Sequence, residues 1–414
     1  MFSARVRRVS SPILPVSAVL AAAFSAGLLV CPAAPAGEGV FLLGNDAQQL
    51  GRASSGVASP RSSYWSYMNP ATMVDMERRL DVNWYSIFTD FEAHPRGVIG
   101  NRFEGTLESE VTGNLVASGF VWPLRVGTLG GGLFVPSGSG VDYPHSRTWL
   151  TRLAGGNVDR RLSYQHIRGV LAYAHDLGDG WSLGVGLHGS LSRLRTDHLT
   201  LSFSGAEANH EWENSLGAGF GAGVYKKWDR WAWGLNYTSR HWTEAMDDYG
   251  DLLRNVLDTP RTVQTGVAWK ASEKVELTLD YKWLNWAGIP SYGGDLLSKG
   301  GFAWKDQHGV KAGVEWRLHD RWTLMAGYSY ANSPVQKDHV LVAMLVPVVT
   351  EQHWTLGVTH RINDRHQVHL TGAWAPRHTM TDSGKGNEPF SLLGKGSTLS
   401  ATAVSVVFGY SFLF

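Results

Sequence analysis

Sixteen histidines and one glycine-rich hexapeptide are the groups in this 414-residue chain whose types and spacing could do chemistry. The hexapeptide GVGLHG, Gly184 to Gly189, fits the G-x-G-x-x-G pattern of dinucleotide sites. Such a site needs a helix directly after the glycines, and nothing helical follows here. The histidines show no metal-ligand spacing, and no G-x-S-x-G elbow supplies a nucleophile. The sequence therefore predicts no metal site, no cofactor and no catalytic residue.

Composition points away from a cytoplasmic enzyme. Only 18% of the residues are charged, and the chain carries 48 glycines, 18 tryptophans and 14 tyrosines. The formal net charge is +1, and no basic run beyond the N-terminus suggests binding to nucleic acid. We therefore look next at the secondary-structure elements in which these aromatic and small residues lie.

The N-terminal segment has the layout of a secretory signal peptide. Three arginines among the first eight residues precede the apolar run ILPVSAVLAAAFSAGLLV, and the small residues APA end at Ala36. We expect residues 1–36 to be removed. The single cysteine, Cys31, lies in this segment, so the mature chain would form no disulfide. A lipoprotein anchor at Cys31 is the alternative, which Val30 disfavours because lipid-attachment signals require a small residue there.

Alternating apolar and polar residues recur along the rest of the chain. In WSLGVGLHGSL, Trp181, Leu183 and Leu187 fall on one parity and small or polar residues on the other, as in a strand with two different faces. Residues 319–331 repeat the pattern. Fourteen strands are predicted at 79–92, 108–122, 127–140, 161–176, 181–196, 213–228, 231–243, 260–271, 274–287, 304–318, 321–333, 351–362, 365–377 and 398–414.

The connections between these strands alternate between six short turns and seven long loops. This alternation is typical of an outer-membrane barrel with short periplasmic turns and long external loops, whereas a soluble β-sandwich has no reason to collect its long loops at one end. Closure is required because an open sheet edge would leave backbone groups unpaired in hydrocarbon. The prediction is an all-β fold, a 14-stranded antiparallel transmembrane β-barrel, with the apolar parity facing lipid and the other facing a lumen.

Aromatic residues next to the short turns support this barrel. Trp181, Trp228, Trp231 and Trp322 would form a periplasmic girdle, where an indole keeps its ring in lipid and its N–H in the headgroups. Core packing in a soluble β-protein is the alternative for each of them. The last strand ends on Phe414, which resembles the C-terminal signal read by the barrel-assembly machinery of outer-membrane proteins.

The segment between the signal peptide and the first strand, residues 37–78, lacks alternation. It is too apolar for a solvated tail and too rich in glycine and serine for one long helix. A barrel of this size encloses more space than its own side chains fill. We therefore expect 37–78 to be a hatch inside the lumen of a barrel formed by 79–414, with a periplasmic extension as the alternative.

The hatch segment and the strands together resemble a known family, the long-chain fatty acid transporter family of outer-membrane proteins (OMPP1/FadL/TodX-like). LGRASSGVA (50–58) followed by NPA (69–71) resembles the family's N-terminal hatch, and the segments 259–286, 304–316 and 346–358 continue the likeness over essentially the whole mature chain. The resemblance assigns the following residues to the hatch: Gly51, Arg52, Asn69, Pro70 and Ala71.

Family membership implies that an apolar groove formed by external loops captures a hydrophobic molecule, which passes to a lumen pocket. A hatch rearrangement then releases it through a lateral opening at an inward kink of the third strand. Lateral exit is favourable because an oily solute gains by entering the bilayer. In this chain the third strand is 127–140. Gly130, Gly131 and Gly132 have no side chains and Pro136 has no N–H, so we expect pairing to be interrupted there. An ordinary strand end with a glycine-rich loop is the alternative.

A fatty acid carboxylate entering an apolar pocket would need a cation. The resemblance assigns this role to Lys305 in WKDQHG. The family's partner arginine would fall in SRLRTDH, where His198 occupies the matching position and Arg195 or Arg193 could substitute. An ion pair of the lumen or a loop is the alternative for each. The departure at His198 leaves room for uncharged ligands such as aromatic hydrocarbons.

The sequence thus predicts passive uptake of hydrophobic compounds, first of all long-chain fatty acids, across the outer membrane of a Gram-negative bacterium. The expected partners are the hydrophobic ligand, outer-membrane lipid with lipopolysaccharide, and the assembly machinery that reads Phe414; a monomer is expected. The alternatives are an aromatic-hydrocarbon channel of the same family, a general porin, and an outer-membrane enzyme, which the lack of a nucleophile and base disfavours.

Overall fold

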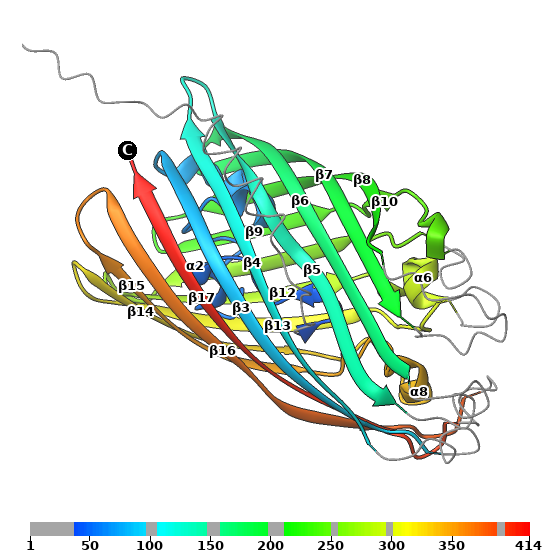
Figure 1. Ribbon diagram of the computed structural model, residues 1–414. Helices are drawn as coiled ribbons and strands as arrows, with labels where there is room; N and C mark the ends of the chain where they lie inside the picture. Colours follow the sequence, from blue (N-terminus) through cyan, green and yellow to red (C-terminus); the bar gives the residue numbers. More distant parts are fainter. Residues whose placement is uncertain are drawn as a thin grey trace, which may run out of the picture.

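The computed structural model describes residues 37–96, 106–146, 158–197, 211–249, 256–294, 301–386 and 394–414. In this part of the chain, fourteen long antiparallel strands form one closed sheet (Figure 1). The strands are β3 (Arg79–His94), β4 (Leu107–Pro123), β5 (Thr128–Ser146), β6 (Val158–Gly178), β7 (Trp181–Asp197), β8 (Glu213–Lys227), β9 (Trp231–Thr238), β11 (Thr262–Lys270), β12 (Val275–Leu284), β13 (Gln307–His319), β14 (Trp322–Ala331), β15 (Gln352–Arg361), β16 (His366–Thr381) and β17 (Thr398–Leu413).

Pairing of the last strand with the first closes the barrel. All of β17 runs antiparallel to β3, from Thr398 opposite His94 to Leu413 opposite Arg79. Every other strand pairs with its neighbours in sequence, as expected when tight turns join antiparallel strands. The predicted 14-stranded barrel is therefore confirmed. The largest difference in strand bounds is at β5, which continues to Ser146 where residue 140 was expected.

The predicted strand 231–243 is interrupted near its end. It consists of β9 and a short strand, β10 (Trp242–Thr243), and both pair with β8. Between them Ser239 stays bound to Phe220 of β8 through its backbone N–H. The irregular residues turn His241 inward, where it is fully buried. A local break of this kind re-aims a side chain without disturbing the rest of the ladder.

The two faces of the strands separate as the alternation predicts. Leu187, in the middle of β7, is 72% exposed on the outer face, whereas its neighbour His188 is 4% exposed on the inner face. The four tryptophans expected beside the short turns are all exposed, and Trp231 stacks on Trp269 with 5.4 Å between the ring centroids. The apolar parity therefore faces outward.

Residues 37–78 lie inside the barrel, so the alternative of a periplasmic extension is wrong (Figure 1). This hatch contains a small hairpin of β1 (Gly37–Glu38) and β2 (Phe41–Leu42), the short helices α2 (Ala47–Leu50) and α3 (Trp65–Met68), and the 3-10 helix η1 (Pro70–Asp75). Asp46 begins α2 by accepting hydrogen bonds from the backbone N–H groups of Gln48 and Gln49. Among the described residues, no helix is long and apolar enough to cross a membrane. The predicted signal peptide lies outside the described residues.

Candidate functional site

The wall of the barrel opens between β4 and β5. These strands pair only near their short turn, from Pro123 opposite Thr128 to Ser118 opposite Leu133. Beyond Leu133, β5 pairs with β6 and no longer with β4, and its register against β6 shifts between Phe134 and Ser137. Pro136 lies within this bulge, where its missing N–H costs no ladder bond.

The hatch takes the place of β4 beside this bulge. Phe41 of β2 pairs with Ser137, and the backbone N–H of Gly138 donates to the carbonyl of Val40 over 2.9 Å. The ladder itself stays paired through Gly130, Gly131 and Gly132. A side chain on Gly130 would meet the sulfur of Met73 in the hatch, so this glycine lets the hatch approach the wall closely.

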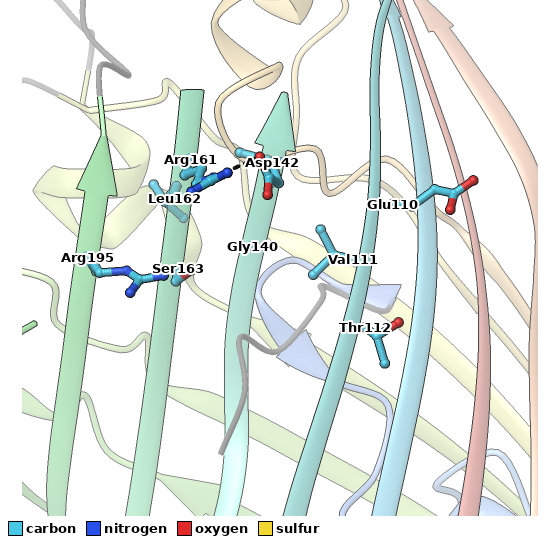
Figure 2. A pocket seen from close by; sticks show the side chains of 10 residues that line it. Glu110, Val111, Thr112, Gly140, Asp142, Arg161, Leu162, Ser163 and Arg195 are labelled. Carbon is cyan, nitrogen blue, oxygen red and sulfur yellow. Dashed lines mark hydrogen bonds and ion pairs between the residues drawn. The ribbon is translucent and has the colours of Figure 1, made fainter. Parts of the chain in front are cut away.

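A cavity of about 190 Å³ occupies the place where β4 and β5 separate (Figure 2). Its lining includes residues of the inner face, Val111, Val141 and Leu162, as well as residues of the outer face, among them Glu110 and Asp142. Both faces of the wall thus contribute to the lining, and the gap between β4 and β5 together with this cavity is here called the wall opening.

The outer rim of the wall opening is polar. Arg161 of β6 donates its Nε–H to Asp142 over 3.0 Å, and Arg195 of β7 lines the same cavity. A hydrogen bond still links the two separated strands, from the backbone N–H of Asp142 to the hydroxyl of Ser109 over 2.7 Å.

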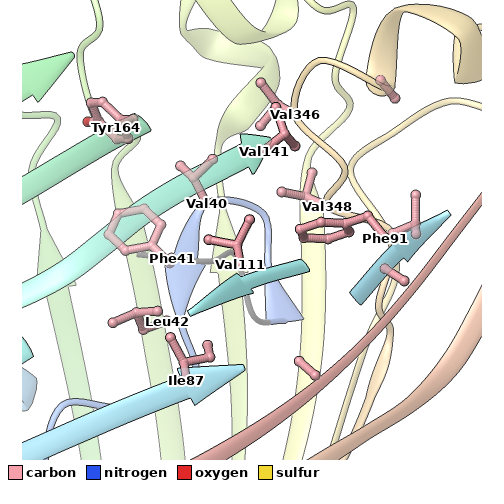
Figure 3. Close-up of a cluster of buried hydrophobic side chains, with 14 of the residues drawn as sticks. Val40, Phe41, Leu42, Ile87, Phe91, Val111, Val141, Tyr164, Val346 and Val348 are labelled. Atoms are coloured by element: carbon pink, nitrogen blue, oxygen red, sulfur yellow. The ribbon is translucent and has the colours of Figure 1, made fainter. Parts of the chain in front are cut away.

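A buried apolar cluster fills the lumen behind the wall opening (Figure 3). The hatch hairpin contributes Val40, Phe41 and Leu42, and the barrel wall contributes residues such as Val111 and Val141. From the long-loop end come Val346 and Val348, next to the short helix α8 (Val340–Ala343). This lumen cluster extends without a break from the long-loop end to the wall opening.

The NPA motif anchors the hatch to β7 and β8. Asn69 caps η1 through its side chain, and its amide group donates to the carbonyls of Val57 and Val224. The hydroxyl of Ser182 on β7 donates to the carbonyl of Ala71 over 2.8 Å. A Cβ on Gly184 would lie 2.3 Å from the backbone nitrogen of Ala71, so the first glycine of the G-x-G-x-x-G pattern accommodates the hatch.

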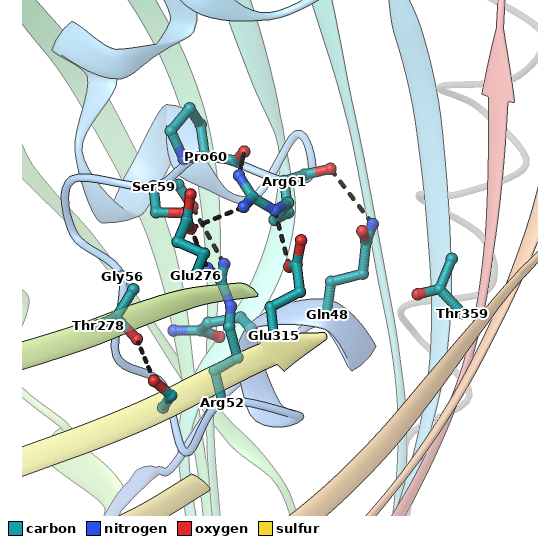
Figure 4. A network of polar contacts seen from close by, with 12 residues as sticks. Gln48, Arg52, Gly56, Ser59, Pro60, Arg61, Glu276, Thr278, Glu315 and Thr359 are labelled. Carbon is teal, nitrogen blue, oxygen red and sulfur yellow. Dashed lines mark hydrogen bonds and ion pairs between the residues drawn. The ribbon is translucent and has the colours of Figure 1, made fainter. Parts of the chain in front are cut away.

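A second anchor is an ion network between the hatch and strands β12 and β13 (Figure 4). Arg61 contacts Glu276 over 2.7 Å and Glu315 over 2.8 Å. Arg52, fully buried, donates to Ser59 and lies 3.6 Å from Glu276. Both arginines belong to the hatch, so its short-turn side is held by charge-assisted bonds rather than by apolar packing alone.

The third anchor places a carboxylate between two lysines. Glu38 of β1 contacts Lys311 of β13 over 2.5 Å and also pairs with Lys282 of β12. Burial raises the pKa of the Glu38 carboxyl group, but the two ammonium groups outweigh burial and lower this pKa to about 2. The carboxylate therefore stays ionised at neutral pH.

The structure does not bring the predicted ligand-binding cations together. Lys305 is exposed, next to the buried Trp304. Arg193 and Arg195 lie on the outer face of β7, where both guanidinium groups approach the ring of Trp212. Their parity is that of Trp181, so the outward direction was already readable from the alternation. His198 lies outside the described residues.

Sequence reasoning missed buried charges of the lumen, among them Glu38, Arg168 and Lys311. Arg168 and Lys311 fall on the inner parity of predicted strands, and a charged residue on that parity was the available signal. No group of histidine, cysteine, aspartate or glutamate among the described residues is arranged to hold a metal ion.

Comparisons with known proteins agree with this geometry. The family model for "Outer membrane protein transport protein (OMPP1/FadL/TodX)" matches residues 28–414. The fold is similar to that of the P. putida toluene transporter TodX, with 15% identity, 90% of this chain and 99% of that chain covered, and a TM-score of 0.68.

Two further solved structures share the fold. A Pseudomonas aeruginosa FadL homologue has 16% identity over 90% of this chain and 98% of its own, with a TM-score of 0.63. The Ralstonia pickettii toluene transporter TbuX has 15% identity over 90% of this chain and 99% of its own, with a TM-score of 0.64. No curated protein sequence matches the chain.

Proposed function

Since the chain belongs to the outer membrane protein transport family (OMPP1/FadL/TodX), we propose that it takes up hydrophobic compounds passively and releases them sideways through the wall opening. Members of this family are transport channels rather than enzymes, and the barrel lies in the outer membrane of a Gram-negative bacterium. The observation that carries the proposal is the continuity of the lumen cluster with the wall opening.

The proposed route avoids water at every step. A ligand leaves the long loops near Val346, displaces side chains of the lumen cluster, and reaches the gap between Val111 and Val141. Lateral exit delivers an apolar solute directly to hydrocarbon, which is favourable in proportion to the apolar surface removed from water. The hatch blocks the straight path to the periplasm, which supports sideways release over a general porin.

Long-chain fatty acids are the first ligand class that we propose. Monoaromatic hydrocarbons are the second, because the lumen cluster continues into a group of packed rings. Trp286 in the 3-10 helix η3 (Trp286–Gly288), Tyr292 in α6 (Pro290–Gly293) and Trp304 lie 4.9 to 5.2 Å apart between ring centroids. The two solved transporters named above for toluene also favour this second class.

The test is uptake of radiolabelled oleate and of radiolabelled toluene by cells that depend on this protein. Val111→Trp, which fills the wall opening, is expected to reduce uptake of both ligands to the level of cells without the protein. Val406→Trp, on the outer face of β17, is the matched control and is expected to transport normally. Normal uptake by folded Val111→Trp protein would exclude the lateral route. A large, steady ion conductance of the wild type in planar bilayers would favour a porin.

A further inference from the structure

The short-turn end of the barrel carries three pairs of like charges on neighbouring strands. In each pair a backbone N–H donates to the carbonyl of the partner over 2.8 to 2.9 Å, and the pairs are Lys270 with Arg230, Arg317 with Lys274, and Arg361 with Arg321. All six side chains, here called the basic belt, are exposed. Like charges opposite each other on neighbouring strands repel. An anionic partner would relieve this repulsion.

A second cavity of about 190 Å³, here called the turn cavity, lies beside the basic belt, between the turn that joins β8 to β9 and the hatch. Its charged lining residues are Arg61, Lys227, Arg230 and Lys270 together with Asp75, Asp229 and Glu276. Lys227 contacts Asp75 over 2.8 Å, and Arg61 contacts Glu276 over 2.7 Å. Of the charged lining residues outside these pairs, two are cations and one, Asp229, is a carboxylate. The turn cavity therefore has an excess of positive charge.

The tryptophans next to these cations indicate the depth of the turn cavity in the membrane. Trp231 follows Arg230 in the chain, and Trp269 precedes Lys270. Trp228 and Trp231, both about half exposed, also line the cavity. An indole at the end of a membrane-spanning strand lies among the lipid head groups, and one residue advances a strand by roughly 3.3 Å. The cations therefore lie at the level of the head-group phosphates. The same adjacency recurs in Trp316–Arg317 and Arg321–Trp322.

The chemistry of the turn cavity favours an anionic phospholipid. The short turns of an outer-membrane barrel lie on the periplasmic side, where the membrane leaflet consists of phospholipid. A guanidinium group matches two phosphate oxygens with its fork of donors, and an ammonium group adds a compact charge. A zwitterionic head group carries its own cation, which the excess positive charge of the cavity would repel. A head group without an amine therefore fits better.

We propose that Arg230 and Lys270 bind the phosphate of an anionic phospholipid from the periplasmic leaflet of the outer membrane. The head group occupies the turn cavity, and the acyl chains leave it along the outer face of the barrel beside Trp231 and Trp269. The turn cavity shares no residue with the lumen cluster or with the cavity of the wall opening. The site therefore holds a membrane lipid rather than the transported ligand, and the proposal does not depend on the proposed function.

The test is native mass spectrometry of the detergent-purified full chain, titrated with phosphatidylglycerol and, separately, with phosphatidylcholine. The wild type is expected to bind phosphatidylglycerol several-fold more tightly. The double variant Arg230→Gln with Lys270→Gln is expected to bind phosphatidylglycerol roughly tenfold more weakly, because each cation near an anionic lipid adds to the attraction, and to bind phosphatidylcholine as before. Lys337→Gln with Lys385→Gln, which removes the same charge from exposed positions at the long-loop end, is the matched control.

The exchange Arg230→Lys with Lys270→Arg keeps both charges and separates loss of charge from loss of structure, so it should bind phosphatidylglycerol as the wild type does. Equal affinity of the wild type for the two lipids, equal losses in the glutamine variant and its control, or weak binding in the exchange variant would overturn the proposal. Tighter binding of inorganic phosphate than of phosphatidylglycerol would assign the site to a free anion instead. Binding of soluble polyglutamate in place of the lipid would assign it to an acidic periplasmic protein, and either result would also overturn the proposal.

Discussion

At the scale of single residues, the charged side chains that face the lumen determine how much a substitution changes stability. Glu38 lies between Lys282 and Lys311, and all three side chains are removed from bulk water to a large extent. Loss of one member of such a group leaves the others uncompensated, which costs more than the intact group contributes. Single substitutions here should therefore have large effects.

Glu38→Gln is expected to lower the free energy of unfolding by about 3 kcal/mol, because two buried ammonium groups would lose their carboxylate. The measurement is denaturant unfolding of the purified barrel in detergent. Glu77→Gln, at an exposed position just after the hatch helix η1, is the control and should change stability little. Equal stability of the two variants would show that the three charges do not hold the hatch.

The lowered pKa of Glu38 also predicts that the stability of the folded barrel decreases at low pH. This pKa falls from 4.5 to about 2 on folding, so the stabilisation is complete above pH 4.5 and is lost as the pH falls toward 2. The shift corresponds to about 3 kcal/mol. Unfolding measured at steps between pH 5 and pH 2 should show this loss in the wild type. In Glu38→Gln the corresponding part of the loss should be absent.

The alternation predicted which face of the barrel wall a side chain points to. It did not predict which other side chains that residue contacts. Arg193 and Arg195 were expected near a ligand although they share the outward parity of Trp181. Arg168 has the inward parity, but its hydrogen-bond partner Tyr67 is about a hundred residues earlier, in a segment without periodicity. No local pattern in the sequence reports a contact of that kind.

At the scale of elements, the local sequence predicts where the strands begin and end, but it does not predict the structure of the hatch. The tight turn between β6 and β7 needs three residues with positive φ, and the chain supplies Gly178, Asp179 and Gly180 there. Strand ends were therefore predictable. The hatch combines short helices and a two-residue hairpin, whose positions are set by contacts with the wall rather than by local propensity.

Gly184→Ala is expected to displace the hatch, because its Cβ would lie 2.3 Å from the backbone nitrogen of Ala71. Overpacking of this kind costs about 1–3 kcal/mol, and the ion conductance of the barrel in planar bilayers should rise. Gly189→Ala is a matched control in the same strand, since a Cβ at Gly189 meets nothing within 4 Å. A conductance rise in both variants, or in neither, would contradict this account of the hatch anchor.

At the scale of the whole molecule, the seam at which β17 closes the barrel against β3 ends in a cation–π contact on the short-turn side. The Arg78 guanidinium lies over the rings of Trp122 and Phe414, and the backbone N–H of Phe414 donates to the carbonyl of Arg78 over 3.1 Å. The C-terminal residue thus joins the strand that closes the barrel to the beginning of β3 and the end of β4.

Phe414→Ala is expected to reduce the amount of assembled barrel in the outer membrane and to lower its stability by about 1 kcal/mol through loss of the cation–π contact. The folded fraction can be measured from the shift in gel mobility on heating. Phe408→Ala, on the same outward face but inside the sheet, is the control for lost lipid contact. Equal yields of the two variants would argue against a special role for the last residue.

The separation of β4 from β5 also has a mechanical consequence. Between β4 and β5 the backbone ladder is complete near the short turn and ends at Leu133, beyond which the bond from Asp142 to the hydroxyl of Ser109 joins the two strands. A tube that is slit over part of its length twists and widens far more easily than an intact one. We therefore expect the half of this barrel near the long loops to deform like a split ring, more easily than the half near the short turns, where the ring of paired strands is unbroken.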